Sequence, residues 1–279
     1  MYYKRAFMLI LATTVIMTLA AACGTSSSSN NSPSSVYKVE YIAGTSAATV
    51  GKTTFQIRVT KKSDDSAATG LAGSITLNPM MDMGMTQHSA PTDIISESTS
   101  TAGTYDCTIY YLMAGTWQLD VKIGSEMTTF SLPVAAAPMG GDTVSKTMYG
   151  TSDIVSGMSD TQYNSYFLFN DDTVSALTPT FKLYITQTKD NKMTFNPLSM
   201  ISSPTGTVAS AIVSASTDST FVTETVTASD EGNGHWSLTG IGDLLSAGTY
   251  TIYVKLNVDS EDKLASGTTP IAAFKVTSH

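Results

Sequence analysis

The chain has 279 residues and a formal net charge of −8, with 42% hydrophobic and only 14% charged residues. This acidic balance argues against nucleic acid, and against an anionic membrane surface, as a partner. The sequence holds only three histidines and contains no P-loop, Gly-x-Ser-x-Gly, His-Glu-x-x-His or dinucleotide-binding motif. We therefore expect a protein that is not an enzyme.

Residues 1–22 have the form of a secretory signal peptide. Lys4 and Arg5 supply a positive start, residues 6–19 carry no charge, and Ala20-Ala21-Ala22 provide the small residues of a cleavage site. A transmembrane helix needs about 20 apolar residues, so this shorter run is predicted to be removed. Its removal takes away two of the 15 basic residues and no acidic one, leaving 13 basic and 23 acidic residues and a net charge of −10.

Cys23 stands at the predicted cleavage point. The segment Leu19–Gly24 resembles a bacterial lipobox, although Leu more often occupies the position of Ala20. The resemblance implies that Cys23 becomes the first residue and carries lipid, which anchors the protein to a membrane of the bacterial cell envelope. That membrane is either the outer membrane, facing the periplasm, or the outer face of the cell membrane. Residues 23–35 then form a Ser- and Asn-rich flexible tether. The alternative is an ordinary secreted protein.

The remaining chain has the pattern of β-strands. Apolar and polar residues alternate over residues 55–60 and again over residues 117–123, and no segment after the signal has a convincing helical period. Short strands at regular spacing, in units of about 100 residues, are typical of an immunoglobulin-like sandwich. We predict an all-β protein with two tandem immunoglobulin-like antiparallel β-sandwich domains.

Three segments recur in the same order, which indicates an internal duplication. Tyr37–Asp64 aligns with Tyr163–Asp190, Ile75–Pro79 with Met193–Pro197, and Ala114–Ile123 with Ala247–Leu256. The alignment predicts that Phe55 corresponds to Phe181, and Trp117 to Tyr250, as core residues. It places the first domain at residues 36–135 and the second, a degenerate repeat, at residues 161–279. Residues 136–160 are predicted to be a linker or an edge segment.

A methionine-rich segment is the best indication of chemistry. Four methionines lie within six residues, and a histidine follows three residues after the last of them. Thioethers select Cu(I), and imidazole also binds copper. Pro79 cannot donate a ladder hydrogen bond, so regular pairing is predicted to stop there and give way to a loop or irregular edge. If this segment is extended, alternation turns residues 81, 83 and 85 to one face. The pattern predicts a Cu(I) site made from Met80, Met81, Met83, Met85 and His88.

Two alternatives to a copper site remain open for this segment. Methionine also fills irregular apolar gaps, and a methionine-rich surface can bind a protein partner. The second copy continues after its Asn-Pro with Leu198–Pro204, which holds one methionine and no histidine. The same loop therefore does not need a methionine cluster for packing. This comparison favours a special role in the first copy and predicts no metal site in the second.

Residues Asn78–Pro91, followed by Gly103-Thr104-Tyr105 and Ala114–Val121, resemble the YtkA-like and FixH-like bacterial domains. The resemblance covers about residues 36–135. It implies an exported immunoglobulin-like domain associated with copper handling and cytochrome oxidase assembly. We expect the lipid on Cys23 to take the place of the FixH-type transmembrane anchor, which supports the metal function more than the assembly function.

Two further residues have a structural and a functional interpretation. Cys107 lies in a strand-like segment and is expected to be a buried thiol that acts as a small hydrophobe, the alternative being a copper ligand or reactive thiol. His235, within Gly232–Trp236, is expected to be a turn residue beside a core tryptophan rather than a ligand.

These observations favour a membrane-anchored, copper-binding lipoprotein of the cell envelope. Its methionine-rich segment would hold Cu(I) for storage, transfer or tolerance, with an envelope protein that donates or accepts copper as the partner. The alternative is a non-catalytic surface or assembly lipoprotein, whose tandem domains bind a protein or a polysaccharide and whose methionines only pack.

Overall fold

The computed structural model describes residues 36–84, 86–155, 162–172, 174, 179–189, 194–202, 206–208, 210–222, 225–241 and 246–279. The predicted signal peptide, Cys23 and the tether lie outside the described residues, and so does Met85. In the described part of the chain, no helix is long and apolar enough to cross a membrane.

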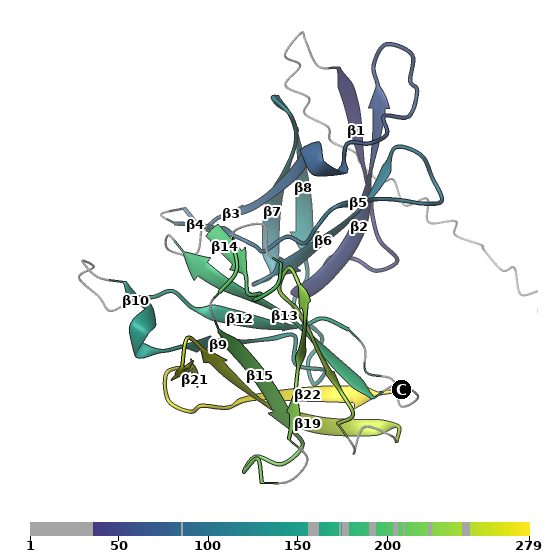
Figure 1. Cartoon of the computed structure of the whole chain (residues 1–279). Helices are drawn as coiled ribbons and strands as arrows, with labels where there is room; N and C mark the ends of the chain where they lie inside the picture. The colour runs from purple at the N-terminus through teal and green to yellow at the C-terminus, as the bar shows by residue number, and fades with distance from the viewer. Residues whose placement is uncertain are drawn as a thin grey trace, which may run out of the picture. The chain divides into compact units, whose positions relative to one another are not determined.

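The first sandwich consists of two antiparallel sheets (Figure 1). One sheet has the strand order β1 (Tyr37–Ile42), β2 (Gly51–Lys61), β6 (Thr104–Tyr111) and β5 (Ser96–Glu97). The other has the order β4 (Gln87–Ser89), β3 (Ile75–Asp82), β7 (Gly115–Ile123) and β8 (Glu126–Val134), and the short 3-10 helix η1 (Ala72–Ser74) leads into β3.

The two sheets share a core that follows the predicted alternation. Phe55, Ile57 and Val59 of β2 are at most 3% exposed and pack in one cluster with Trp117 and Leu119 of β7. The residues between them in β2 are exposed or half-buried. Full burial of a large apolar side chain contributes about 1.5–3 kcal/mol, so the inward faces of β2 and β7 account for much of the stability of this sandwich.

The second sandwich also has two antiparallel sheets. The larger sheet has the order β17 (Ser229–Gly232), β18 (His235–Thr239), β13 (Thr180–Lys189), β12 (Tyr166–Asn170), β9 (Ser145–Tyr149) and β21 (Leu264–Ala265), with β14 (Thr194–Pro197) also paired to β13. The smaller sheet has the order β16 (Val226–Thr227), β15 (Ala211–Ser216), β19 (Gly248–Val258) and β20 (Glu261–Asp262), with β22 (Ala272–Ser278) also paired to β19. Between β9 and β12 lie η2 (Thr151–Asp153) and the strand pair β10 (Ile154–Val155) and β11 (Gln162–Tyr163).

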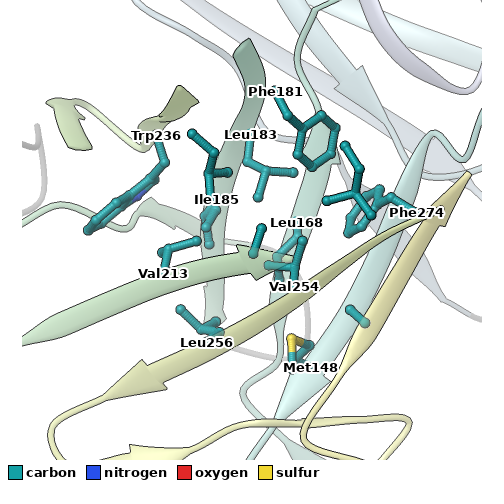
Figure 2. Packing of buried hydrophobic residues seen from close by; sticks show 14 of the residues in the cluster. Met148, Leu168, Phe181, Leu183, Ile185, Val213, Trp236, Val254, Leu256 and Phe274 are labelled. Carbon is teal, nitrogen blue, oxygen red and sulfur yellow. The ribbon is translucent and has the colours of Figure 1, made fainter. Parts of the chain in front are cut away.

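The core of the second sandwich is a separate cluster (Figure 2). Figure 2 shows Leu183 and Ile185 of β13 among side chains of the smaller sheet, including Val213, Val254 and Leu256. All five are at most 1% exposed. Two tandem antiparallel β-sandwiches of immunoglobulin type are therefore present, which confirms the predicted fold class.

The two sandwiches repeat one strand arrangement. The orders β1-β2-β6-β5 and β4-β3-β7-β8 of the first correspond to β12-β13-β18-β17 and β16-β15-β19-β22 of the second. Phe55 and Phe181 lie in the corresponding strands β2 and β13, and both are buried. Trp117 and Tyr250 lie in the corresponding strands β7 and β19, but Tyr250 is only partly buried.

One of the three aligned segments is wrong as a structural match. Ile75–Pro79 belongs to β3, which pairs with β7, whereas Thr194–Pro197 forms β14, which pairs with β13 in the other kind of sheet. The counterpart of β3 is β15, because β15 pairs with β19 as β3 pairs with β7. A short strand followed by Asn-Pro is a local pattern that suits either sheet, so it does not identify the strand. The chain after β15, Thr217–Phe221, again holds no methionine and no histidine.

Residues 136–160, predicted to be a linker or an edge segment, contribute a strand to the second sandwich. Ser145–Tyr149 forms β9, which lies between β12 and β21 in the larger sheet of the second sandwich. Met148 of this strand is fully buried in the second core. The second sandwich therefore begins before residue 161, because the apolar side chain of Met148 fills its core.

Candidate functional site

The methionine-rich segment forms a β-hairpin made by β3 and β4. Met80 pairs with Ser89, Met81 with His88, and Asp82 with Gln87. The turn is closed by the Met83 amide, which donates to the Thr86 carbonyl at 2.9 Å. It is tightened by the Gly84 amide, which donates to Asp82 Oδ1 at 2.7 Å, and Gly84 has a φ of 85° that favours glycine.

The prediction that regular pairing stops at Pro79 is wrong. β3 continues to Asp82, with Pro79 opposite Leu119 of β7 and Met80 opposite Gln118. β4 pairs with β3 only from Met80 onward. Proline has no N–H to donate, but β4 offers no ladder partner opposite Pro79, so β3 loses no hydrogen bond to β4 there.

Met81 and His88 face each other across this hairpin. Residues directly opposite in an antiparallel pair lie on the same side of the sheet, about 4.5–5.5 Å apart at their β-carbons. Met81 is half-buried against the core of the first sandwich. Its terminal methyl lies over Gly115 of β7, where an added β-carbon would come within 2.2 Å of Met81 Cε.

The other predicted ligands are placed differently. Met80 neighbours Met81 in the strand, so its side chain lies on the opposite face of the sheet. Met83 lies in the hairpin turn, just beyond the strand, and is 51% exposed. Met85 lies outside the described residues. The hairpin therefore brings Met81 and His88 together, adds Met83 at its tip, and separates Met80 from them.

His88 carries a polar atom without a partner. Its Nδ1 is buried and has no hydrogen-bond partner in the described part of the chain. Buried polar atoms without partners are rare in native structures, and in the tautomer with the proton on Nε2 this nitrogen has a free electron pair. The unpaired nitrogen lies on the residue opposite Met81, so one nitrogen and one sulfur ligand are available on the same face.

Harder ligands do not gather in the described residues. These hold no group of three or more His, Cys, Asp or Glu side chains that could bind a metal ion. Cys107 is buried in β6, where burial, with a smaller contribution from the Asp106 charge, raises the pKa of its thiol to about 12. It therefore resembles a small hydrophobe more than a reactive thiol. A metal at the hairpin would rely on thioethers.

His235 has a role that its local sequence did not reveal. It begins β18 after a turn at Asn233 and Gly234, and its ring lies between two carboxylates, those of Asp93 and Asp171. Asp171 is 64 residues away in the sequence and Asp93 is 142 residues away. No local motif connects these positions, so only the folded chain brings them together.

No protein-family profile matches the sequence, and no curated protein matches it. Among solved structures, the adhesin InvE of Yersinia pseudotuberculosis is similar, at 13% identity and a TM-score of 0.28, over 86% of this chain and 58% of the adhesin chain. This chain thus spans little more than half of that adhesin. Domains 5–6 of the S-layer protein SbsC match at 17% identity and a TM-score of 0.24, over 87% of this chain and 98% of theirs. The titin domains Z1Z2 in complex with telethonin match at 11% identity and a TM-score of 0.22, over 88% of this chain and 96% of the titin chain. Likenesses at this level carry no information about function.

Proposed function

We propose that this protein is a non-catalytic lipoprotein of the bacterial cell envelope whose first sandwich binds Cu(I) at the β3–β4 hairpin. Met81, Met83 and His88 are the proposed ligands, and Met85 is a further candidate from the sequence. The observation that carries the proposal is the cross-strand pair of Met81 and His88, in which His88 Nδ1 is buried without a hydrogen-bond partner.

The chemistry of these donors favours a soft ion. Thioether sulfur binds Cu(I) well and binds Zn²⁺, Mg²⁺ and Ca²⁺ poorly, whereas imidazole nitrogen suits copper in either state. Asp82 adds only a single carboxylate to the hairpin, and its Oδ1 accepts the Gly84 amide in the turn. A site of this composition would take up or release Cu(I) without a change in oxidation state, which suits storage, transfer or tolerance.

The geometry of the hairpin also supports a site that exchanges its ion. Met83 is 51% exposed at the turn, whereas Met81 is half-buried against the first core. One ligand is thus held by packing, and a second is reachable by a copper-donating or copper-accepting envelope protein. Met80 lies on the other face, and we do not include it among the proposed ligands.

Titration of the purified protein with Cu(I), with Ag(I) as an analogue and Zn(II) as a control, tests this proposal. We expect one Cu(I) per chain and no comparable Zn(II) binding. Replacing Met81, Met83 and Met85 together by Leu keeps volume and apolarity, and such swaps usually cost less than about 1.5 kcal/mol each. This triple variant should fold and lose Cu(I) binding.

The matched control is the double variant Met127→Leu and Met139→Leu. These methionines are 58% and 102% exposed and lie outside the hairpin. The double variant should bind Cu(I) as the unmodified protein does. Copper binding that survives in the triple variant would show that the hairpin methionines serve packing, as in the alternative of a surface or assembly module.

A further inference from the structure

The ring of His235 joins carboxylates from the two sandwiches. Its Nδ1 lies 3.0 Å from Asp171 Oδ2, at the end of β12 in the second sandwich. Its Nε2 lies 3.0 Å from Asp93 Oδ2, in the segment between β4 and β5 of the first sandwich. A carboxylate only accepts hydrogen bonds, so both ring nitrogens donate when both contacts are made, and the ring is then an imidazolium.

Two more donors from the first sandwich hold Asp171. The Tyr110 hydroxyl of β6 donates to Asp171 Oδ1 at 2.5 Å. Lys52 Nζ of β2 lies 3.2 Å from the same oxygen and donates to the Asp171 carbonyl at 2.6 Å. The Asp171 side chain is only 7% exposed. A carboxylate of the second sandwich is therefore buried among cationic and hydroxyl donors of the first.

Aromatic packing shields this cluster from water. The rings of Tyr110 and Tyr184 stack with centroids 4.1 Å apart and an interplanar angle of 2°. Phe169 completes a small buried cluster with them, separate from both sandwich cores. Tyr184 also contacts the His235 ring, at 5.2 Å between centroids. Charged hydrogen bonds are stronger when water is excluded, so the ion pairs here count for more than exposed ones.

We propose that His235 is a protonation-dependent latch that holds the two sandwiches in one arrangement. As an imidazolium it donates to Asp93 and Asp171 at once. As a neutral ring it has a single N–H and keeps only one of these hydrogen bonds, and its other nitrogen then presents a lone pair to a carboxylate. Deprotonation therefore turns a lone pair toward either Asp93 or Asp171, which is a repulsive contact that weakens the junction. When the lost hydrogen bond is the one to Asp93, the link that His235 makes between the sandwiches is broken.

The charges around the ring also favour a junction that is weakened when His235 loses its proton. The titratable groups of the elements packed against it are Lys52 of β2, Asp93, Tyr110 of β6, Asp171, and Tyr184 of β13. With Lys52 and His235 both cationic, the two carboxylates are neutralised. Loss of the imidazolium proton leaves one uncompensated negative charge at a partly buried junction, which is unfavourable.

The pKa values point the same way. Burial opposes protonation of His235, but hydrogen bonds to Asp171 and Asp93 outweigh it and raise its pKa from 6.5 to about 9. Burial likewise opposes ionisation of Asp171, but hydrogen bonds from His235 and Tyr110 lower its pKa to about 2. Because the pKa of His235 is higher in the folded protein, its protonation stabilises the closed junction. This stabilisation is complete below the pKa of 6.5 in the unfolded chain and is lost as the pH rises through about 9.

Histidine NMR on the full chain, which has only three histidines, tests the protonation step. We expect the resonances of His235 to titrate with a midpoint well above the ordinary histidine pKa of 6.5. Asp93→Asn removes one carboxylate and should lower the titration midpoint of His235 while the protein stays folded. A titration midpoint of His235 at or below the ordinary histidine pKa of 6.5 would overturn the proposal.

Small-angle scattering tests the arrangement of the sandwiches. We expect a narrow distance distribution at about pH 6 and a broader one at about pH 10. At the higher pH even an imidazole with a raised pKa has lost its proton. His235→Gln should show the broad distribution already at about pH 6. A neutral amide carries its N–H donors on one nitrogen, so it cannot replace an imidazolium that donates in two opposite directions. His279→Gln is the matched control and should behave as the unmodified protein. A His235→Gln variant with retained circular dichroism and an unchanged distribution would refute the latch.

Discussion

The terminal methyl of Met81 occupies the space above the α-carbon of Gly115, on the neighbouring strand β7. An added β-carbon at Gly115 would lie 2.2 Å from Met81 Cε. The absence of a side chain at Gly115 therefore fixes where Met81 lies, and with it the proposed copper ligand opposite His88.

Gly115→Ala should displace Met81 and weaken both folding and Cu(I) binding. Overpacking of a core usually costs about 1–3 kcal/mol, and Gly115 also has a φ of 145°, which other residues rarely adopt. Urea unfolding and Cu(I) titration measure the two effects. Gly124→Ala is the matched control, since Gly124 has a φ of 60° but its added β-carbon would meet nothing within 4 Å. Equal loss of copper affinity in both variants would contradict a specific role for Met81.

His88 should make Cu(I) binding depend on pH. Imidazole binds a metal only when its nitrogen is unprotonated, whereas thioethers do not titrate. The affinity of the unmodified protein should therefore fall as the solution becomes acidic. His88→Leu should bind Cu(I) more weakly at neutral pH and lose this dependence. Competition titrations across the pH range measure both outcomes, and a pH dependence that persists in His88→Leu would show that it does not come from His88.

Lys263 is predicted to be a major determinant of stability in the second sandwich. Its side chain is 2% exposed, and its ammonium lies 3.0 Å from Asp153 Oδ2 and 2.5 Å from Glu261 Oε2. Lys263→Met keeps the apolar stem but leaves the Asp153 carboxylate buried without its cation, which should cost about 3–5 kcal/mol. Chemical unfolding measures this loss. Lys38→Met is the control, because Lys38 pairs with Glu40 at a site where both side chains are well exposed, and it should change little.

The same cluster should make the second sandwich sensitive to acid. Burial opposes ionisation of Glu261, but hydrogen bonds from Lys263, Ser152 and Thr151 outweigh it and hold its pKa well below 4.5. Because the pKa of Glu261 is lower in the folded protein, its ionised carboxylate stabilises the fold above pH 4.5. This stabilisation is lost as the pH falls through the lowered pKa. In Lys263→Met, the free energy of unfolding should depend less on pH in this range.

Cys23 should determine whether the protein stays with membranes. Acyl chains contribute about 0.8 kcal/mol per buried CH₂, so a diacylated cysteine anchors stably. Cys23→Ser should release the protein into the soluble fraction or leave it unprocessed with a larger mass. Fractionation and intact mass measure both. A variant with unchanged mass and unchanged membrane association would refute the lipid anchor.

The sequence alone determined the fold class and the long alternating strands. Alternation in β2 and β7 predicted which side chains are buried, because the two faces of a strand differ in polarity whenever one face packs on a core. It also determined which metal-binding groups the hairpin offers, since four thioethers and an imidazole within a short segment can be recognised without a structure. The duplication was visible where strands carry long alternating patterns, as in Phe55 and Phe181.

The tertiary structure decided what depends on register and on distant partners. The continuation of β3 through Pro79 depends on where β4 begins to pair, and the pairing of Met81 with His88 depends on the hairpin register. The short sequence alignment of β3 with β14 was wrong as a structural match, because strand propensity does not specify which sheet a strand joins. His235 meets Asp171 when the second sandwich folds and meets Asp93 only when the two sandwiches pack, and carboxylates so far apart in the chain leave no local pattern. Local periodicity thus specifies strands and faces, whereas pairing partners and junction contacts are decided by the packing of the whole chain.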